Sequence, residues 1–218
     1  MSLNLLNRLL TSFILLVILF VGLFLNKFFC LYLLIAASMI SYYEFFNLNK
    51  KKFKKKRNKI YLSNIISFLY LSFFIFTSYD LYVSSLITFI FAILICILSD
   101  TGGYIIGNLI GGRKLTKLSP KKTIAGSIGS FIFSLFPIII YSLIFNSTYQ
   151  SINLFILILL CLFLSLICQF GDLVISYFKR QAKVKDTGSL LPGHGGLLDR
   201  IDGIIFVLPA AYIIDKLF

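Results

Sequence analysis

The sequence predicts an all-α fold: a polytopic integral membrane bundle of about seven transmembrane helices. Hydrophobic residues make up 59% of the chain and the mean hydropathy is +0.95, which lies beyond the range of a soluble globular domain. Apolar runs of transmembrane length recur along the chain, and each span needs roughly 20 residues. The 218 residues therefore fit one integrated bundle and leave no room for a separate soluble domain.

The candidate spans are seven apolar runs, at residues 9–25, 28–46, 60–76, 82–98, 125–145, 152–170 and 203–217. The first follows Arg8 and has no small-residue cleavage site after it, so we expect a retained helix rather than a signal peptide. Pro137 and Pro209 are expected to kink the fifth and seventh spans. No CxxC pair occurs, and we expect four small core hydrophobes at Cys30, Cys96, Cys161 and Cys168.

The basic residues predict the orientation of the bundle. With a cytoplasmic N-terminus, all of the 21 Lys and Arg residues except Lys27 and Lys216 fall on one side, as expected for cytoplasmic loops. Every residue from Lys50 to Arg57 except Phe53 is basic, which indicates a topology anchor that attracts anionic lipid headgroups rather than a nucleic-acid site. We expect residues 1–95 to hold the N-terminal helices with a basic cytoplasmic loop at 47–59, and residues 96–218 to form a C-terminal transmembrane region that carries the site described next.

The acidic residues indicate a site at the cytoplasmic ends of the spans. Only eight Asp and Glu residues occur, and Asp100 and Asp172 each follow a long apolar run, where an unpaired carboxylate is costly. Asp172, Ser176 and Lys179 fall at i, i+4 and i+7 of a continued sixth span, and Asp199 and Asp202 share a face near the last span. Such carboxylates suit magnesium, although salt bridges closing the bundle are the alternative that spacing leaves open. We expect Glu44 to be a structural partner of a basic residue.

Two glycine-rich, basic stretches indicate a polyphosphate site. In "PGHGG", residues 192–196, glycines permit positive φ and close approach of backbone amides to a phosphate, and a helix start near Leu197 would add further amides. The stretch "GGRKLTKLSPKKTIAG", residues 111–126, combines turns, lysines and hydroxyls with a helix start near Ile124. The phosphate-loop pattern GxxxxGK[ST] is absent. The site therefore has a different construction from that loop.

The run "SYFKRQAKVKDTGSLLPGHGGLLDRID", Ser176 to Asp202, resembles the signature of the phosphatidate cytidylyltransferase (CDP-diacylglycerol synthase) family of integral membrane enzymes. The upstream motifs "SDTGGY", "SPKKT" and "GDL" are also present, and the resemblance covers roughly residues 95–217. It implies a nucleotidyltransferase of phospholipid biosynthesis that converts CTP and phosphatidate into CDP-diacylglycerol and pyrophosphate. The implied cofactor is Mg²⁺, with a second cation that is K⁺ or Mg²⁺.

The resemblance also implies roles for individual residues. Asp172, Asp199 and Asp202 would hold the metal, and the wider catalytic set adds Lys179, Arg180, Lys185, Asp186, His194 and Arg200. For His194, proton donation to the leaving pyrophosphate and fixation of the loop both remain open. The expected substrate-binding residues are Asp100, Ser119, Lys121, Lys122, Thr123, Ser176, Gly195 and Gly196, where the hydroxyls either bind phosphate or cap helices.

Several alternatives and partners complete the expectation. Another CTP-dependent lipid enzyme, of the CDP-archaeol synthase or polyprenol kinase type, is the first alternative, and a membrane transporter is the second. A transporter would be expected to place charges at the bilayer midplane and to show internal repeats. The expected partners are CTP, phosphatidate and membrane lipids, without nucleic acid, and a homodimer is left open. The expected location is the bacterial cytoplasmic membrane, with the active site facing the cytoplasm.

Overall fold

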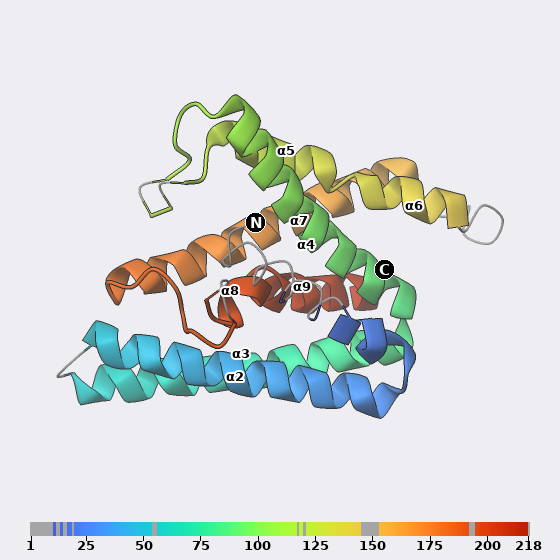
Figure 1. Cartoon of the computed structure of the whole chain (residues 1–218). Helices are drawn as coiled ribbons and strands as arrows, with labels where there is room; N and C mark the ends of the chain where they lie inside the picture. Colours follow the sequence, from blue (N-terminus) through green and yellow to red (C-terminus); the bar gives the residue numbers. More distant parts are fainter. Residues whose placement is uncertain are drawn as a thin grey trace. The chain divides into compact units, whose positions relative to one another are not determined.

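The described part of the chain is all-α, as predicted, with its helices joined by loops (Figure 1). The computed structural model describes residues 11, 14, 17, 18, 20–53, 56–116, 118, 119, 121–144, 153–191 and 195–217. Within these residues the β features are two isolated bridges, Lys114 with Thr123 and Leu191 with Gly195. The helices fall into two compact units: residues 1–83 with 177–202, and residues 84–176 with 203–218. The predicted division of the chain at residue 95 stays a prediction.

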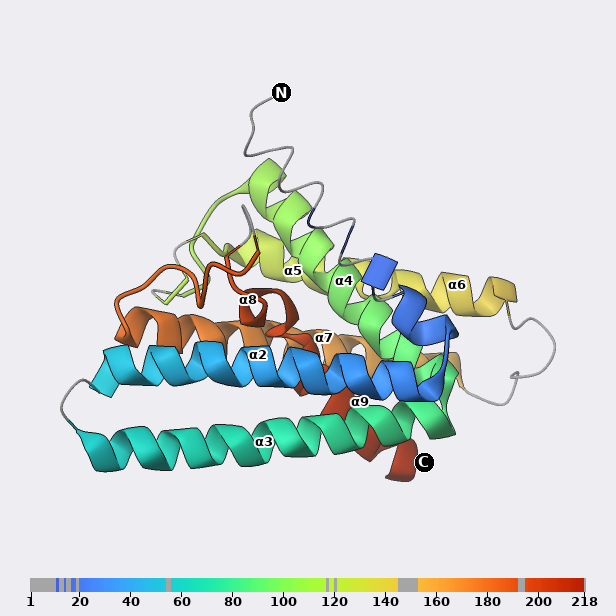
Figure 2. The same ribbon diagram turned by 60° about the horizontal axis from the view of Figure 1, so that its bottom comes forward.

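The first unit is built on two antiparallel helices, α2 (Lys27–Phe53) and α3 (Arg57–Ser84), which lie side by side in both views (Figures 1 and 2). Asn49 Nδ2 of α2 donates to Asn64 Oδ1 of α3 at 2.8 Å, and the rings of Tyr42 and Phe68 lie 6.0 Å apart. A buried amide pair can bond only in one alignment of two apolar helices. The pair therefore fixes the register of this hairpin.

The structure corrects two expected boundaries in this hairpin. The segment "TSYD", residues 77–80, was expected to connect two spans but lies inside α3. The Thr77 hydroxyl donates to the Phe73 carbonyl at 2.9 Å, so a polar residue is accommodated without breaking the helix. Residues 47–53 were expected in a loop but continue α2, whose last turn carries Lys50, Lys51 and Lys52. Basic side chains are favourable at a helix C-terminus because they offset its negative end.

The first unit also contains the last turn of α7 (Leu154–Gln181) and the segment that follows it. Phe178 packs against Phe45 with ring centroids 4.7 Å apart, and Lys52 Nζ lies 4.4 Å from the centroid of the Phe178 ring. The helix ends where Lys183 adopts a φ of 56° and the Val184 amide donates to the Lys179 carbonyl. The chain then turns back toward the short helix α8 (Leu198–Ile201), which packs on α2.

The second unit is organised around α4 (Leu86–Ile110), which packs against α5 (Ile124–Phe133), α6 (Phe136–Ile144) and α9 (Ile204–Leu217). Glycines lie where α4 and α5 cross, and a Cβ at Gly126 would lie only 2.8 Å from the Gly103 carbonyl oxygen. Gly102 and Gly129 face each other in the same contact. Small residues let the two backbones approach closely, which is how helices gain packing energy in lipid, where the hydrophobic effect does not drive their association.

Polar side chains join α7 to the other helices of the second unit. The Ser99 and Ser165 hydroxyls lie 2.9 Å apart, and the Ser127 hydroxyl donates to Gln169 Oε1 at 2.5 Å. The predicted fifth span is interrupted between α5 and α6 at residues 134 and 135. Pro137 sits in the first turn of α6, where its missing N–H is tolerated, so the expected kink is confirmed as a break.

Four of the described helices, α2, α3, α4 and α7, are long and apolar enough to cross a membrane. Residues 124–140 form a shorter apolar helical stretch, and α9 has 14 residues. The first predicted span, residues 9–25, lies largely outside the described residues. The helical composition and these spans support an integral membrane protein, whereas the count of seven and the cytoplasmic N-terminus stay predictions.

Candidate active site

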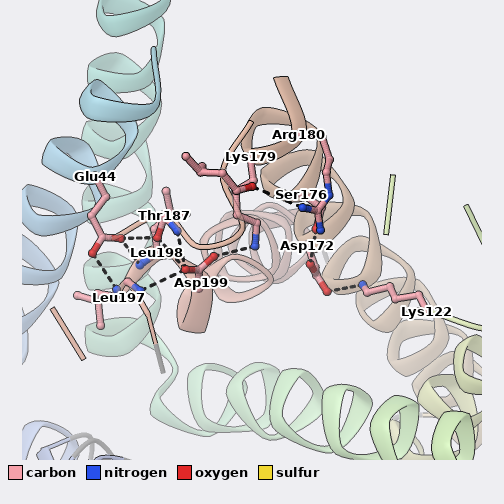
Figure 3. Close-up of polar contacts among 12 residues, drawn as sticks. Glu44, Lys122, Asp172, Ser176, Lys179, Arg180, Thr187, Leu197, Leu198 and Asp199 are labelled. Atoms are coloured by element: carbon pink, nitrogen blue, oxygen red, sulfur yellow. Dashed lines mark hydrogen bonds and ion pairs between the residues drawn. The ribbon is translucent and has the colours of Figure 1, made fainter. Parts of the chain in front are cut away.

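Asp199 lies at the centre of a polar cluster in the first unit (Figure 3). Its Oδ1 accepts from Lys179 Nζ at 2.7 Å, and its Oδ2 accepts from the backbone amides of Thr187 at 2.8 Å and Gly196 at 3.2 Å. The Thr187 hydroxyl lies 3.0 Å from the same Oδ2. The side chains of Asp199 and Lys179 are only 6% and 12% exposed, so this is an enclosed ion pair supported by hydrogen bonds.

The partner expected for Glu44 of α2 was wrong. Glu44 was expected to pair with a basic side chain, but its carboxylate accepts from the backbone amides of Leu197 and Leu198, both at 3.0 Å, and from the Thr187 hydroxyl at 2.7 Å. The side chain is 4% exposed. The amides at the predicted helix start therefore bind an anion, as expected, but that anion belongs to the protein itself. A lone glutamate in an apolar span was the available sequence signal, since a buried carboxylate needs partners.

The glycines of the signature pack against these carboxylates. A Cβ at Gly196 would overlap Thr187 Oγ1 and Glu44 Oε2, and one at Gly188 would lie 2.7 Å from Glu44 Oε1. Gly195 adopts a φ of 92°, which favours glycine, and exchanges two backbone hydrogen bonds with Leu191. The amides of Gly195 and Gly196 thus have partners inside the protein. Their expected role toward substrate stays a prediction.

A second cluster lies in the other unit, where Lys122 forms an ion pair with Asp172 of α7 (Figure 3). Asp172 Oδ1 also accepts from the Ser176 hydroxyl at 3.2 Å, one helical turn later. The Asp172 and Lys122 side chains are 25% and 28% exposed, in contrast to the enclosed Asp199. Asp172, Ser176 and Lys179 all lie on α7, as the spacing predicted. This cluster therefore presents a carboxylate and an ammonium that remain accessible.

The loop before α5 positions Lys122. The Leu115 amide donates to the Lys122 carbonyl at 2.9 Å, and the Ile124 amide donates to the Arg113 carbonyl at 3.0 Å, so the loop folds back on itself. Thr123 is the N-cap of α5, and its Oγ1 accepts from the Gly126 amide at 3.0 Å. The helix start predicted near Ile124 is confirmed. Of the two roles considered for the Thr123 hydroxyl, capping is the one observed.

The remaining predicted site residues differ in burial. Asp202 is buried, at 7% exposed, and follows the last turn of α8, while Ser119 is partly buried and its carbonyl accepts from the Lys122 amide at 3.0 Å. Cys168 Sγ lies 3.8 Å from Asp100 Oδ1. His194 lies outside the described residues. The exposed members of the predicted set are Asp100, Lys121, Arg180, Lys185, Asp186 and Arg200.

The predicted metal ligands do not form a ready three-carboxylate group. Among the described residues no three or more Asp, Glu, His and Cys side chains gather as a metal site. Asp172 suits a hard cation, since it is partly exposed, and Mg²⁺ often takes one or two carboxylates together with substrate phosphates. Asp199 could coordinate a metal only by exchanging a lysine or amide partner. Metal binding by Asp172, Asp199 and Asp202 stays a prediction.

These features define a polytopic helical membrane protein with lysine–aspartate clusters at motifs typical of phosphate chemistry. The sequence model of the cytidylyltransferase family matches residues 61–218. The chain belongs to the cytidylyltransferase family, as its motifs predicted.

The chain is also similar to curated phosphatidate cytidylyltransferases. It is 48% identical to that of Staphylococcus haemolyticus over 128 residues, which are 57% of this chain and 47% of the relative. The identity is 44% over 126 residues with the enzyme of Staphylococcus saprophyticus, again 57% of this chain and 47% of the relative. It is 48% over 128 residues with that of Staphylococcus aureus, with the same coverages. The chain thus spans about half the length of these relatives.

Proposed function

We propose that this protein transfers the cytidylyl group of CTP to phosphatidate, giving CDP-diacylglycerol and pyrophosphate. The observation that carries the proposal is the family match over residues 61–218, which includes both lysine–aspartate clusters. The names of the similar staphylococcal proteins support phosphatidate as the acceptor. The four long apolar helices support a substrate that stays in the bilayer.

The reaction requires two anions to meet. A phosphatidate oxygen attacks the α-phosphorus of CTP, the new P–O bond forms, and the bond to pyrophosphate breaks with its electron pair leaving on the pyrophosphate oxygen. Because the phosphatidate oxygen is already ionised near neutral pH, catalysis depends on positioning and on neutralising negative charge more than on a general base.

Lys122 is the cation best placed for this role. Its ammonium is partly exposed and already binds a carboxylate oxygen of Asp172, so a phosphate oxygen can replace that partner without new desolvation of the amine. Lys121 is exposed in the same motif as Lys122, and the signature segment carries three further exposed cations, Arg180, Lys185 and Arg200. Each set would supply positive charge for a phosphate-bearing substrate. Lys179 is held more rigidly, because its partner Asp199 is itself fixed by two backbone amides.

Magnesium is part of the proposal, with Asp172 as the carboxylate that would hold it together with the nucleotide phosphates. When bound, the ion would neutralise phosphate charge and favour departure of pyrophosphate. The proposed location is the bacterial cytoplasmic membrane with the site facing the cytoplasm, which would let CTP arrive from water while the acyl chains of phosphatidate remain in lipid. The predominance of lysine and arginine in the site segments supports this orientation.

The test uses purified protein in detergent with radiolabelled CTP, Mg²⁺ and phosphatidate. We expect a lipid-soluble labelled product that requires all three. Asp172→Asn should lower the rate by about 100-fold or more, as expected for loss of a group that organises charge in the transition state. Asp215→Asn is the matched control, since Asp215 accepts from Thr88 in the same unit but lies in none of the motifs. It should retain the wild-type rate.

The outcomes separate the alternatives. If the folded wild-type protein uses a different acceptor lipid, such as an archaeol phosphate or a polyprenol, that lipid replaces phosphatidate in the proposal. A protein that binds no CTP would overturn it. Equal losses in Asp172→Asn and Asp215→Asn would remove Asp172 from the site.

A further inference from the structure

Glu44 joins α2 to the signature segment, although it precedes residues 61–218 that match the family. Its three hydrogen bonds reach residues 187, 197 and 198, which are more than a hundred positions away in the sequence. Figure 3 shows its carboxylate directed toward Thr187, Leu197 and Leu198. One buried carboxylate from a different helix therefore holds three residues of the signature segment.

The bonds to Glu44 account for its burial. A buried carboxylate is strongly unfavourable unless its oxygens accept hydrogen bonds, and here Oε1 accepts from one backbone amide while Oε2 accepts from one amide and one hydroxyl. Because the partners are a hydroxyl and backbone amides rather than a flexible lysine, the geometry of all three is set by the fold. The bonds are thus specific for this position of the segment.

Thr187 connects Glu44 to Asp199. Its hydroxyl lies within donating distance of both carboxylates, 2.7 Å from Glu44 Oε2 and 3.0 Å from Asp199 Oδ2. Its backbone amide also donates to Asp199 Oδ2, at 2.8 Å. One residue thereby fixes two carboxylates, and the second of these holds the Lys179 ammonium.

We propose that Glu44 is a positioning residue that acts through Thr187 to hold Asp199 and Lys179 in their reactive arrangement. The catalytic part of this inference rests on the proposed cytidylyltransferase function. Glu44 itself does not touch substrate. Its removal is expected to leave substrate binding largely intact and to slow the chemical step, because small displacements of charged groups at a reacting centre reduce the rate strongly.

The test compares Glu44→Gln, Thr187→Val and Thr187→Ser, with rates expressed per folded molecule. We expect Glu44→Gln and Thr187→Val each to lower kcat about tenfold while the KM for CTP and for phosphatidate changes less than about twofold. Thr187→Ser keeps the hydroxyl and should restore most of the rate. The double variant should be no slower than the slower single variant, because Glu44 is proposed to act through the Thr187 hydroxyl, which Thr187→Val already removes.

The matched control is Thr77→Val, which also removes a buried threonine hydroxyl from the first unit. Among the residues that the structure describes, the Thr77 hydroxyl donates to carbonyls of its own helix alone, so its loss should leave kcat unchanged. If kcat falls as much in Thr77→Val as in Thr187→Val, the loss of rate reflects the loss of any buried hydroxyl and not the link to Glu44. Fully additive losses in the double variant would overturn the link through Thr187.

Hydrogen–deuterium exchange separates this inference from the proposed function. In Glu44→Gln, the amides of Gly196, Leu197 and Leu198 should exchange at least about tenfold faster, whereas Thr77→Val should show wild-type exchange. If the wild-type protein is inactive but exchange is still faster in Glu44→Gln than in wild type, the proposed reaction is overturned and Glu44 remains the residue that fixes the segment. Unchanged exchange in Glu44→Gln would overturn the inference whatever the activity.

Discussion

Replacing Asp199 with asparagine should destabilise the first unit through an electrostatic conflict that has no good side-chain orientation. If the asparagine oxygen faces the Thr187 and Gly196 amides, its NH₂ group faces the Lys179 ammonium. If the side chain is flipped, the NH₂ group faces the two amides instead. Either orientation sets donor against donor. The mutation thus removes the carboxylate that, among the described residues, forms an ion pair with this ammonium, whose side chain is only 12% exposed.

The expected cost follows from this enclosure. Breaking one side of a buried ion pair costs about 3 kcal/mol or more, because the remaining charge stays desolvated. For a chain of this length, 1 kcal/mol shifts the midpoint of thermal unfolding by about 2–4 °C, so Tm should fall by roughly 6–12 °C. Lys179→Met in the Asp199→Asn background should restore at least half of this loss, since Nδ2 then no longer faces a cation.

The assay uses the thiols of the protein itself. The four cysteines are free and buried, so a thiol-reactive fluorogenic dye reports unfolding in detergent without added labels. Asp186→Asn is the control, because Asp186 is an exposed carboxylate in the same segment and its change should alter Tm by less than about 2 °C. An Asp199→Asn protein with the Tm of wild type, or a double variant less stable than the single one, would refute the enclosed ion pair.

Three further perturbations test the second unit. Gly126→Ala places a Cβ about 2.8 Å from the Gly103 carbonyl oxygen and should lower the free energy of unfolding by about 2 kcal/mol. Ile128→Ala, on the exposed face, should lower it far less, and equal Tm values for the two variants would refute close packing of α4 and α5. Thr123→Ala removes the α5 cap and should lower the free energy of unfolding by about 1 kcal/mol, whereas Thr123→Ser keeps the cap and should not. Equal losses of stability in denaturation curves of the two variants would argue against capping. Lys122→Gln should raise the KM for CTP about tenfold in the labelled-CTP assay, while an unchanged KM would leave the lysine a structural role only.

The sequence was sufficient for the fold class because lipid imposes a strong rule: every span needs a long apolar helix. Boundaries were less predictable where polar residues lie inside a helix. The polar "TSYD" segment suggested a loop, but α3 continues through it because the Thr77 hydroxyl donates to carbonyls of its own helix. Conversely, the apolar run at 125–145 conceals a break, because α5 ends at Phe133 and a new helix begins at Phe136 with Pro137 in its first turn.

Within the candidate site, local spacing predicted what one helix determines. The placement of Asp172 and Ser176 one turn apart on α7 and the start of α5 after Thr123 both follow from the 3.6-residue period and from capping preferences. The partners of Lys122 and Glu44 could not be read in this way. Each is brought to its partner by tertiary packing between segments distant in sequence, for which one sequence offers no periodic signal.

The glycines of the signature show how a motif can be recognised correctly and explained incompletely. Glycine near a phosphate site suggests amides free to bind the ligand, yet the Gly196 amide donates to Asp199, and its missing side chain makes room for Glu44 and Thr187. Part of the glycine requirement therefore comes from the protein's own carboxylates. If that is correct, Gly196→Ala should increase exchange at Leu197 and Leu198 in the absence of any substrate, as Glu44→Gln should. A glycine that served the ligand alone would leave the substrate-free protein unchanged.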